Sequence, residues 1–191
     1  MSYTVFRTPG LSYAMHIVAR VVLKIMGWRV QNNEATPRKC VMVAAPHTSN
    51  WDLPYTLLLG FALRIRANWM GKKALFRKPF SLFFKYLGGI PVDRSSSHNV
   101  VDQMIEVFRS CEEFILIISP EGTRSKVSAW KSGFYHISLG AQVPLILGFI
   151  DYTRKIGGIG PIFQYSGDYE QDMMKIKEFY APIRGKVRKN I

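Results

Sequence analysis

Short apolar runs alternate with longer amphipathic segments along most of the chain. The runs are rich in β-branched residues, which is typical of buried strands; they are VMVAA (41–45), IPV (90–92), FILIIS (114–119) and VPLILGFI (143–150). Segments with helical periodicity lie between or after them, at 50–66, 74–86, 98–110, 131–141 and 168–180. Strands that alternate with helices usually pair in parallel. The pattern therefore predicts a single α/β domain, with a mixed, mostly parallel sheet flanked by helices.

The segment LSYAMHIVARVVLKIMGW, residues 11–28, has a helical pattern of its own. His16, Arg20 and Lys24 recur every four positions and so share one helix face, while apolar residues cover most of the rest. A membrane-spanning helix needs about 20 apolar residues and disfavours a central charge such as Arg20. The pattern predicts an amphipathic helix that lies in a membrane interface or packs on the protein's own core. On the first reading, residues 1–30 are a membrane-association segment and residues 31–191 are the main domain.

The charge of the chain changes this picture. Its 191 residues carry a net charge of +13. Residues 1–94 hold 14 basic and 3 acidic side chains (14 − 3 = +11), whereas residues 95–191 hold 12 and 10 (12 − 10 = +2). A basic half of this kind indicates a polyanionic partner, either nucleic acid or an anionic membrane. The stretch ALFRKPFSLFFKYLG (74–88) mixes cations with phenylalanine and leucine; it is too apolar for a nucleic-acid groove and favours a membrane surface.

Polar clusters follow each predicted strand. His47 and Asp52 follow the first strand, Asp93-Arg94 the second, PEGTRS (120–125) the third and DYTR (151–154) the fourth. Ligand sites of open α/β sheets form outside the carboxyl ends of the strands. If the strands are parallel, these clusters converge on one edge of the sheet, and the sequence predicts a site there.

The first cluster contains a potential acid–base pair. Ser49-Asn50-Trp51-Asp52 has the form of a capping box with Ser49 as the N-cap. His47 would then precede the helix and Asp52 would lie in its first turn, close enough to orient the imidazole as a general base. The alternative is that Asp52 only caps a helix and His47 is a surface histidine.

The third cluster has the composition of an anion-binding loop. Gly122 permits a tight turn, Thr123 offers a hydroxyl and Arg124 offers a planar donor that suits phosphate. Arg94, after the second strand, would supply a second cation. The alternative is a plain turn with solvated charges. The sequence contains no G-x-S-x-G nucleophile motif and no constellation of metal ligands, and its two cysteines, Cys40 and Cys111, have no disulfide or metal spacing, which favours a reducing compartment.

Taken in order, four blocks resemble the sequence motifs of the glycerolipid acyltransferases, and most closely those of the lysophosphatidate (1-acylglycerol-3-phosphate) acyltransferases. The blocks are HTSNWD (47–52), GGIPVDR (88–94), PEGTR (120–124) and VPLILG (143–148). The resemblance covers about residues 40–150. It implies O-acyl transfer from coenzyme A or acyl carrier protein to the hydroxyl of a lysolipid, without a metal, cofactor or covalent intermediate, by a peripheral, monotopic protein at the cytoplasmic face of the inner membrane.

The resemblance also implies roles for individual residues. His47 would be the general base and Asp52 its orienting partner. Pro144 would help to shape the site beside the acyl thioester. The residues implied to bind the glycerophosphate part of the acceptor are Arg94, Glu121, Gly122, Thr123 and Arg124.

Three residues depart from the family pattern: Pro46, Trp51 and Pro91. They leave the predicted base unchanged but keep other acceptors open, such as a lyso-aminolipid or another lysophospholipid. Two functions of other classes also remain as alternatives. One is a non-catalytic lipid-binding protein with the same fold, and the other is a basic nucleic-acid-binding module.

Overall fold

A seven-stranded sheet forms the centre of the protein. The computed structural model describes residues 4–33, 35–92, 97–123, 125, 127 and 129–187. The strand order is β1-β7-β6-β2-β5-β3-β4, and every neighbouring pair is parallel except β6 and β7. The strands are β1 (Arg29–Asn32), β2 (Lys39–Ala45), β3 (Ala67–Lys72), β4 (Gly89–Val92), β5 (Phe114–Ile118), β6 (Leu145–Asp151) and β7 (Ile156–Phe163).

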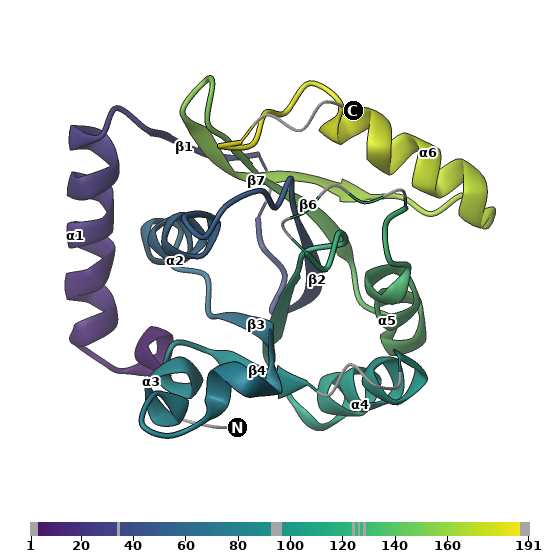
Figure 1. Cartoon of the computed structure of the whole chain (residues 1–191), viewed down its shortest axis with the longest axis horizontal. Coiled ribbons are helices and arrows are strands. Elements are labelled where there is room, and N and C mark those ends of the chain that lie inside the picture. Colours follow the sequence, from purple (N-terminus) through teal and green to yellow (C-terminus); the bar gives the residue numbers. More distant parts are fainter. Residues whose placement is uncertain are drawn as a thin grey trace.

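Helices cover both faces of the sheet, which gives three layers (Figure 1). One face carries α1 (Leu11–Ile25), α2 (Asp52–Ala62) and α3 (Ser81–Tyr86). The other carries α4 (Ser97–Ser110), α5 (Gly133–Ala141) and α6 (Tyr169–Tyr180). Two short 3-10 helices, η1 (Val5–Arg7) and η2 (Lys73–Phe76), accompany the first layer. The fold class is therefore the one that the sequence predicts.

The central strands are apolar because both of their faces are buried. All five residues of β5 are buried, and successive residues of β2 point to opposite layers. Val41 and Val43 pack in the core under α4, α5 and α6, whereas Cys40 and Met42 pack in the core under α1 and α2. The two cores bury both faces of the central sheet, and the loops at its carboxyl edge extend from these buried strands.

Helix α1 is anchored on one side and open on the other. Ala19 and Leu23 are completely buried in the core that α1 shares with α2, and His16 Nδ1 lies 3.1 Å from the carbonyl oxygen of Phe61. The outward side is apolar and exposed; it includes Leu11, Tyr13, Ile17, Val18, Val21 and Ile25. The helix thus packs on the core and still presents a second apolar surface. None of the helices in the described part of the chain is long and apolar enough to cross a bilayer.

Candidate active site

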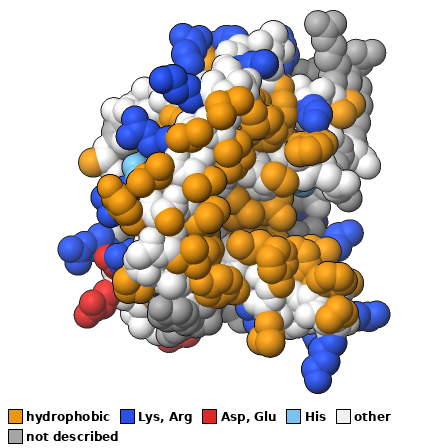
Figure 2. All heavy atoms as spheres, turned by 90° about the vertical axis from the view of Figure 1, so that its left-hand side faces the viewer, with side chains coloured by type: hydrophobic (Ala, Val, Ile, Leu, Met, Phe, Trp, Pro, Cys, Tyr) orange, Lys and Arg blue, Asp and Glu red, His pale blue; other side chains and the backbone are white. Residues whose placement is uncertain are grey.

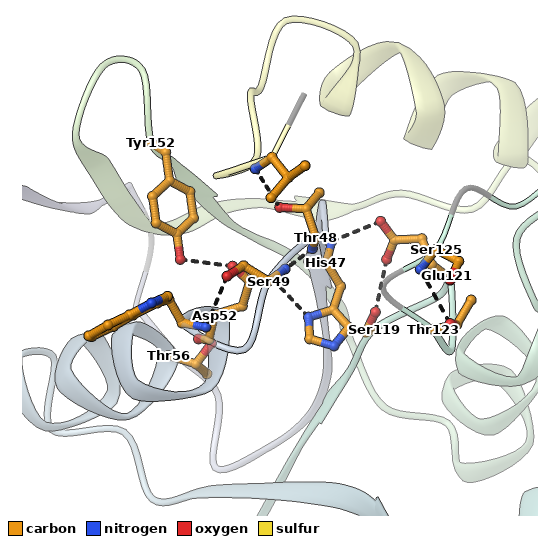
Figure 3. Close-up of polar contacts among 12 residues, drawn as sticks. His47, Thr48, Ser49, Asp52, Thr56, Ser119, Glu121, Thr123, Ser125 and Tyr152 are labelled. Carbon is orange, nitrogen blue, oxygen red and sulfur yellow. Dashed lines mark hydrogen bonds and ion pairs between the residues drawn. The ribbon is translucent and has the colours of Figure 1, made fainter. Parts of the chain in front are cut away.

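Three neighbouring strands deliver their polar residues to one edge of the sheet. The carboxyl end of β2 leads to His47, that of β5 leads to Ser119 and Glu121, and that of β6 leads to Tyr152. Because β2 is parallel to both β5 and β6, these ends meet beside the start of α2 (Figure 3). The convergence expected from the sequence is present for these three clusters.

His47 and Asp52 are in direct contact. His47 Nδ1 lies 2.9 Å from Asp52 Oδ2. A carboxylate only accepts hydrogen bonds, so the proton belongs on Nδ1 and the lone pair on Nε2, at the other side of the ring. The His47 side chain is 31% exposed, whereas that of Asp52 is 8% exposed. A half-buried imidazole with its tautomer fixed by a buried carboxylate is the arrangement that general-base catalysis requires.

Four donors hold the carboxylate of Asp52. Its Oδ2 accepts from His47 Nδ1, from the backbone N–H of Thr48 at 2.7 Å and from that of Ser49 at 2.8 Å, and its Oδ1 accepts from the hydroxyl of Tyr152 at 2.8 Å. Burial by itself would raise the pKa of Asp52, but these hydrogen bonds outweigh it and lower the pKa below its ordinary value. Asp52 is therefore an anion at neutral pH, with a fixed orientation.

The start of α2 differs from the predicted capping box. The helix begins at Asp52 with Trp51 as its N-cap, so the prediction of Ser49 as the N-cap is wrong. The hydroxyl of Ser49 accepts instead from the N–H of Trp51 at 3.2 Å. Only the reciprocal half of the motif forms, in which the acidic side chain reaches back to the N–H of Ser49. This half fixes Asp52 next to His47.

Glu121 holds the histidine loop from the opposite side. One carboxylate oxygen accepts from the backbone N–H of His47 at 2.9 Å, and the other accepts from the hydroxyl of Ser119 at 2.8 Å. Glu121 is only 5% exposed. An anionic side chain that faces protein donors is unsuited to bind phosphate. The geometry thus favours a positioning task for Glu121 over the phosphate binding implied by the family resemblance.

A cavity of about 450 Å³ opens beside the imidazole. Gly122 and Thr123 line it, so these two residues of the predicted anion loop do lie at the site. Leu75 and Phe84 also line the cavity and add apolar surface to it. Gly122 has a φ of +64°, a conformation that favours glycine.

Lys72 also lines this cavity, although no motif in the sequence marks it. It is the last residue of β3, a strand that the apolar pattern does not reveal. Its position at the carboxyl end of a parallel strand is the signal that would have found it, had β3 been recognised.

The remaining predicted site residues either lie outside the described part of the chain or lie away from the site. Arg94 and Arg124 lie outside the described residues. Pro144 does not lie at the site, because it precedes β6 and its carbonyl accepts from the N–H of Val41 at 3.0 Å, at the amino edge of the sheet. Seven residues of β6 separate the two edges, a span of roughly 20 Å. The expectation that Pro144 shapes the site is therefore corrected.

No group of three or more His, Cys, Asp or Glu side chains in the described ranges is placed to hold a metal ion.

Comparisons with known proteins address the family and the fold. A sequence model of the acyltransferase family matches residues 27–146, which include β2, α2, β5 and the His47–Asp52 pair. Curated protein sequences give no match. Among solved structures, the fold is similar to that of PlsC, a 1-acyl-sn-glycerophosphate (LPA) acyltransferase from Thermotoga maritima, with a TM-score of 0.60 and 17% sequence identity over 90% of this chain and 78% of that one. The chain thus belongs to the acyltransferase family.

Proposed function

We propose that the protein transfers an acyl group from a thioester of coenzyme A or acyl carrier protein to the hydroxyl of a lysophospholipid, with 1-acylglycerol-3-phosphate as the preferred acceptor. The observation that carries the proposal is the contact of His47 Nδ1 with Asp52 Oδ2 at the wall of a cavity. Membership in the acyltransferase family and the fold of PlsC support the class of reaction.

The chemistry starts at His47. An alcohol is a poor nucleophile at neutral pH because its proton is lost only with difficulty. As the acceptor oxygen bonds to the thioester carbonyl carbon, His47 Nε2 takes the hydroxyl proton, and Asp52 stabilises the resulting imidazolium. The tetrahedral intermediate then collapses, the carbon–sulfur bond breaks, and the leaving thiolate receives the proton from the imidazolium. The products are an ester and a thiol, and the histidine returns to its neutral state.

The lining of the cavity contains both polar and apolar groups, as a lysophosphatidate-like acceptor requires. Lys72 supplies a cation for the phosphate, and the hydroxyl of Thr123 supplies a donor. Arg94 and Arg124 remain proposed as further phosphate ligands. Leu75, Phe84 and Trp69 supply apolar surface for an acyl chain. A phosphate at one end and a hydrocarbon chain at the other are the features of this acceptor class.

The test is an assay of purified protein with one labelled acyl thioester and a panel of lysolipids. Lysophosphatidate should give the most product. Lys72→Met should raise the KM for lysophosphatidate about tenfold, since a charge-assisted contact is lost, and should change the KM for the thioester less than twofold. Lys73→Met is the matched control, because Lys73 is exposed but does not line the cavity. Equal loss with a phosphate-free monoacylglycerol would contradict a phosphate-binding task for Lys72, and a stronger signal from a lyso-aminolipid would replace the proposed acceptor.

We also propose that the protein works while attached to an anionic membrane. Exposed apolar side chains gather on the face formed by α1 and the η2–α3 segment, and lysines and arginines lie around them (Figure 2). The η2–α3 segment contributes Leu75, Phe80, Leu82 and Phe83 to this apolar face. Leu75 belongs both to this face and to the cavity beside His47. Leu75 therefore links the proposed membrane face to the cavity, and an acyl chain would pass this side chain between the membrane and the site.

Replacing Leu82 and Phe83 with serine should weaken binding to vesicles containing phosphatidylglycerol about tenfold or more, because each side chain loses burial in lipid. Binding of the unaltered protein should also fall as salt is added, since salt screens the basic residues. The matched control is the pair Leu139→Ser and Met174→Ser, two exposed apolar residues on α5 and α6 in the opposite layer. Flotation with vesicles gives the measurement, and equal affinity of all three proteins would contradict the proposed attachment.

A further inference from the structure

We propose that Tyr152 is a positioning residue of the site, which holds the carboxylate of Asp52 in the orientation that His47 needs. The inference rests on the proposed function. Tyr152 follows β6 and stands 100 positions from Asp52 in the chain, yet its hydroxyl donates to Asp52 Oδ1 at 2.8 Å (Figure 3). It belongs to the DYTR cluster at the carboxyl end of this strand, for which the sequence offers no role.

The two oxygens of Asp52 are held from different directions. Oδ2 has three donors, all from the loop of residues 47–49. Oδ1 accepts from Tyr152, a donor on another strand. The carboxylate turns about the Cβ–Cγ bond, and contacts to Oδ2 alone would restrain this rotation at one oxygen only. The hydroxyl of Tyr152 restrains the other oxygen, and so it fixes the plane of the carboxylate against the imidazole.

The ring of Tyr152 is itself fixed by aromatic packing. It meets the rings of Trp28 and Tyr55 edge to face, with centroid distances of 5.3 and 5.4 Å. Trp28 and Tyr55 are both buried, 7% and 8% exposed, and their own centroids lie 4.4 Å apart. Pairs of this geometry are favourable and directional. The cluster therefore sets the direction in which the hydroxyl points.

The backbone around Tyr152 is held as well. Its N–H donates to the carbonyl of Arg184 at 2.9 Å. The preceding residue, Asp151, is fully buried and accepts from the backbone N–H of Arg154 at 2.9 Å and from its Nε at 2.8 Å. These contacts fix the turn after β6 from both sides. Tyr152 thus has little freedom in either its main chain or its side chain.

The protonation state suits this task. Burial and the hydrogen bond to Asp52 raise the pKa of Tyr152 well above its ordinary value. The phenol therefore keeps its proton throughout the range in which His47 would act, and it remains a donor. A positioning residue of this kind should affect the rate of the chemical step and leave substrate binding unchanged.

The first variant is Tyr152→Phe, which removes the hydroxyl and keeps the ring. We expect kcat to fall about tenfold or more, the size expected for losing a hydrogen bond to a charged group, and the KM of each substrate to change less than twofold. Tyr55→Phe is the matched control, because Tyr55 belongs to the same aromatic cluster and its hydroxyl makes no hydrogen bond within the described residues. It should keep kcat within twofold of the unaltered protein. A Tyr152→Phe protein with unchanged kcat would overturn the inference.

A double-mutant cycle separates positioning from general support of the fold. If Tyr152 acts through Asp52, then Tyr152→Phe should cost nothing further, within twofold, when it is added to Asp52→Ala. The same tenfold loss in both backgrounds, or a loss that follows a lowered unfolding temperature, would assign Tyr152 a structural role and overturn the inference. Failure of the proposed function gives a different result. The unaltered protein would then transfer no acyl group to any lysolipid, and the role inferred for Tyr152 would be wrong as well.

Discussion

His47→Ala is expected to lower kcat by about a thousandfold or more. General-base help typically contributes about 10²–10⁴-fold, and no other histidine is in contact with the carboxylate of Asp52 in the described residues. Alanine leaves the acceptor hydroxyl to lose its proton to water. The measurement is acyl transfer from a labelled thioester at saturating substrate. Added imidazole should restore part of the rate, because the truncation leaves space beside the cavity.

The fold should survive this change. The His47 side chain is partly exposed, and Asp52 keeps its bonds to Thr48, Ser49 and Tyr152. Vesicle binding and the unfolding temperature should stay close to those of the unaltered protein. His136→Ala is the matched control: His136 lies on α5, where its ring stacks on Tyr169, and its loss should leave kcat within twofold. A His47→Ala protein with more than about a tenth of the original activity would contradict His47 as the base, whereas an unaltered protein that binds lipid without acyl transfer would favour a non-catalytic lipid-binding protein.

The sequence predicts the centre of the fold well because burial there is strong. The runs at 41–45, 114–119 and 143–150 become β2, β5 and β6, whose residues are almost all buried. The same strands carry His47, Glu121 and Tyr152 at their carboxyl ends. A continuous apolar run bounded by polar residues is a direct consequence of a strand covered on both faces, so the strands and the site edge are predicted together.

Strands β1, β3 and β7 are missed because their sequences lack such runs, whereas the edge strand β4 is predicted from IPV (90–92). Strand β1 reads RVQN and is mostly exposed. Strand β7 reads IGGIGPIF, and glycine and proline disfavour strands when they are judged alone. Its Gly158 has a φ of +152°, and a Cβ there would lie 1.9 Å from the carbonyl oxygen of Gln31 on β1. Close approach of two backbones explains the glycine, but only the paired strands reveal it.

The helix predicted over 74–86 is divided for a local reason. Residues 73–76 form η2 and residues 81–86 form α3, with Pro79 between them. Proline lacks a backbone N–H and disfavours a helical conformation in the residue before it. The periodicity of apolar positions continues across the break, which is why the pattern predicts one helix. The break lets Phe76 and Phe84 both pack near Trp69 of β3.

The tasks of individual site residues depend on tertiary contacts that no local pattern contains. The His47–Asp52 contact is predictable, because five positions and a helix start bring the two side chains together. The bond from the backbone of His47 to Glu121 spans 74 positions, and that from Tyr152 to Asp52 spans 100. Such pairs follow from which strands are neighbours, and the neighbours of β2 are β5 and β6. The order of the motifs along the sequence identifies the site. The order of the strands in the sheet determines which distant residues support it.

Asp52→Asn tests the electrostatic part of the mechanism with little change of shape. Three N–H donors face Oδ2. An asparagine must place its carbonyl oxygen at this position, because its amide N–H groups cannot accept hydrogen bonds from those donors. The amide then points to the hydroxyl of Tyr152, which is also able to accept. The oxygen of Tyr152 then accepts from the amide, its own proton loses Oδ1 as an acceptor, and the proton of His47 stays on Nδ1. The asparagine differs from the aspartate chiefly in having no charge.

We therefore expect Asp52→Asn to lower kcat about 10- to 100-fold, because a neutral amide stabilises the developing imidazolium less than a carboxylate does. The free energy of unfolding at neutral pH should fall by only about 1 kcal/mol, since the contacts at Oδ2 remain and the partly buried hydroxyl of Tyr152 can donate to water instead. Hydrogen bonds lower the pKa of Asp52 in the folded protein below that in the unfolded chain. The charged carboxylate therefore stabilises the fold at every pH above the ordinary aspartate pKa of about 4. This stabilisation is lost as the pH falls through the lower pKa of the folded protein. The stability difference between the two proteins should accordingly narrow below about pH 4, as urea unfolding at several pH values will measure. An Asp52→Asn protein with nearly full activity would show that the carboxylate serves only to hold the loop before α2.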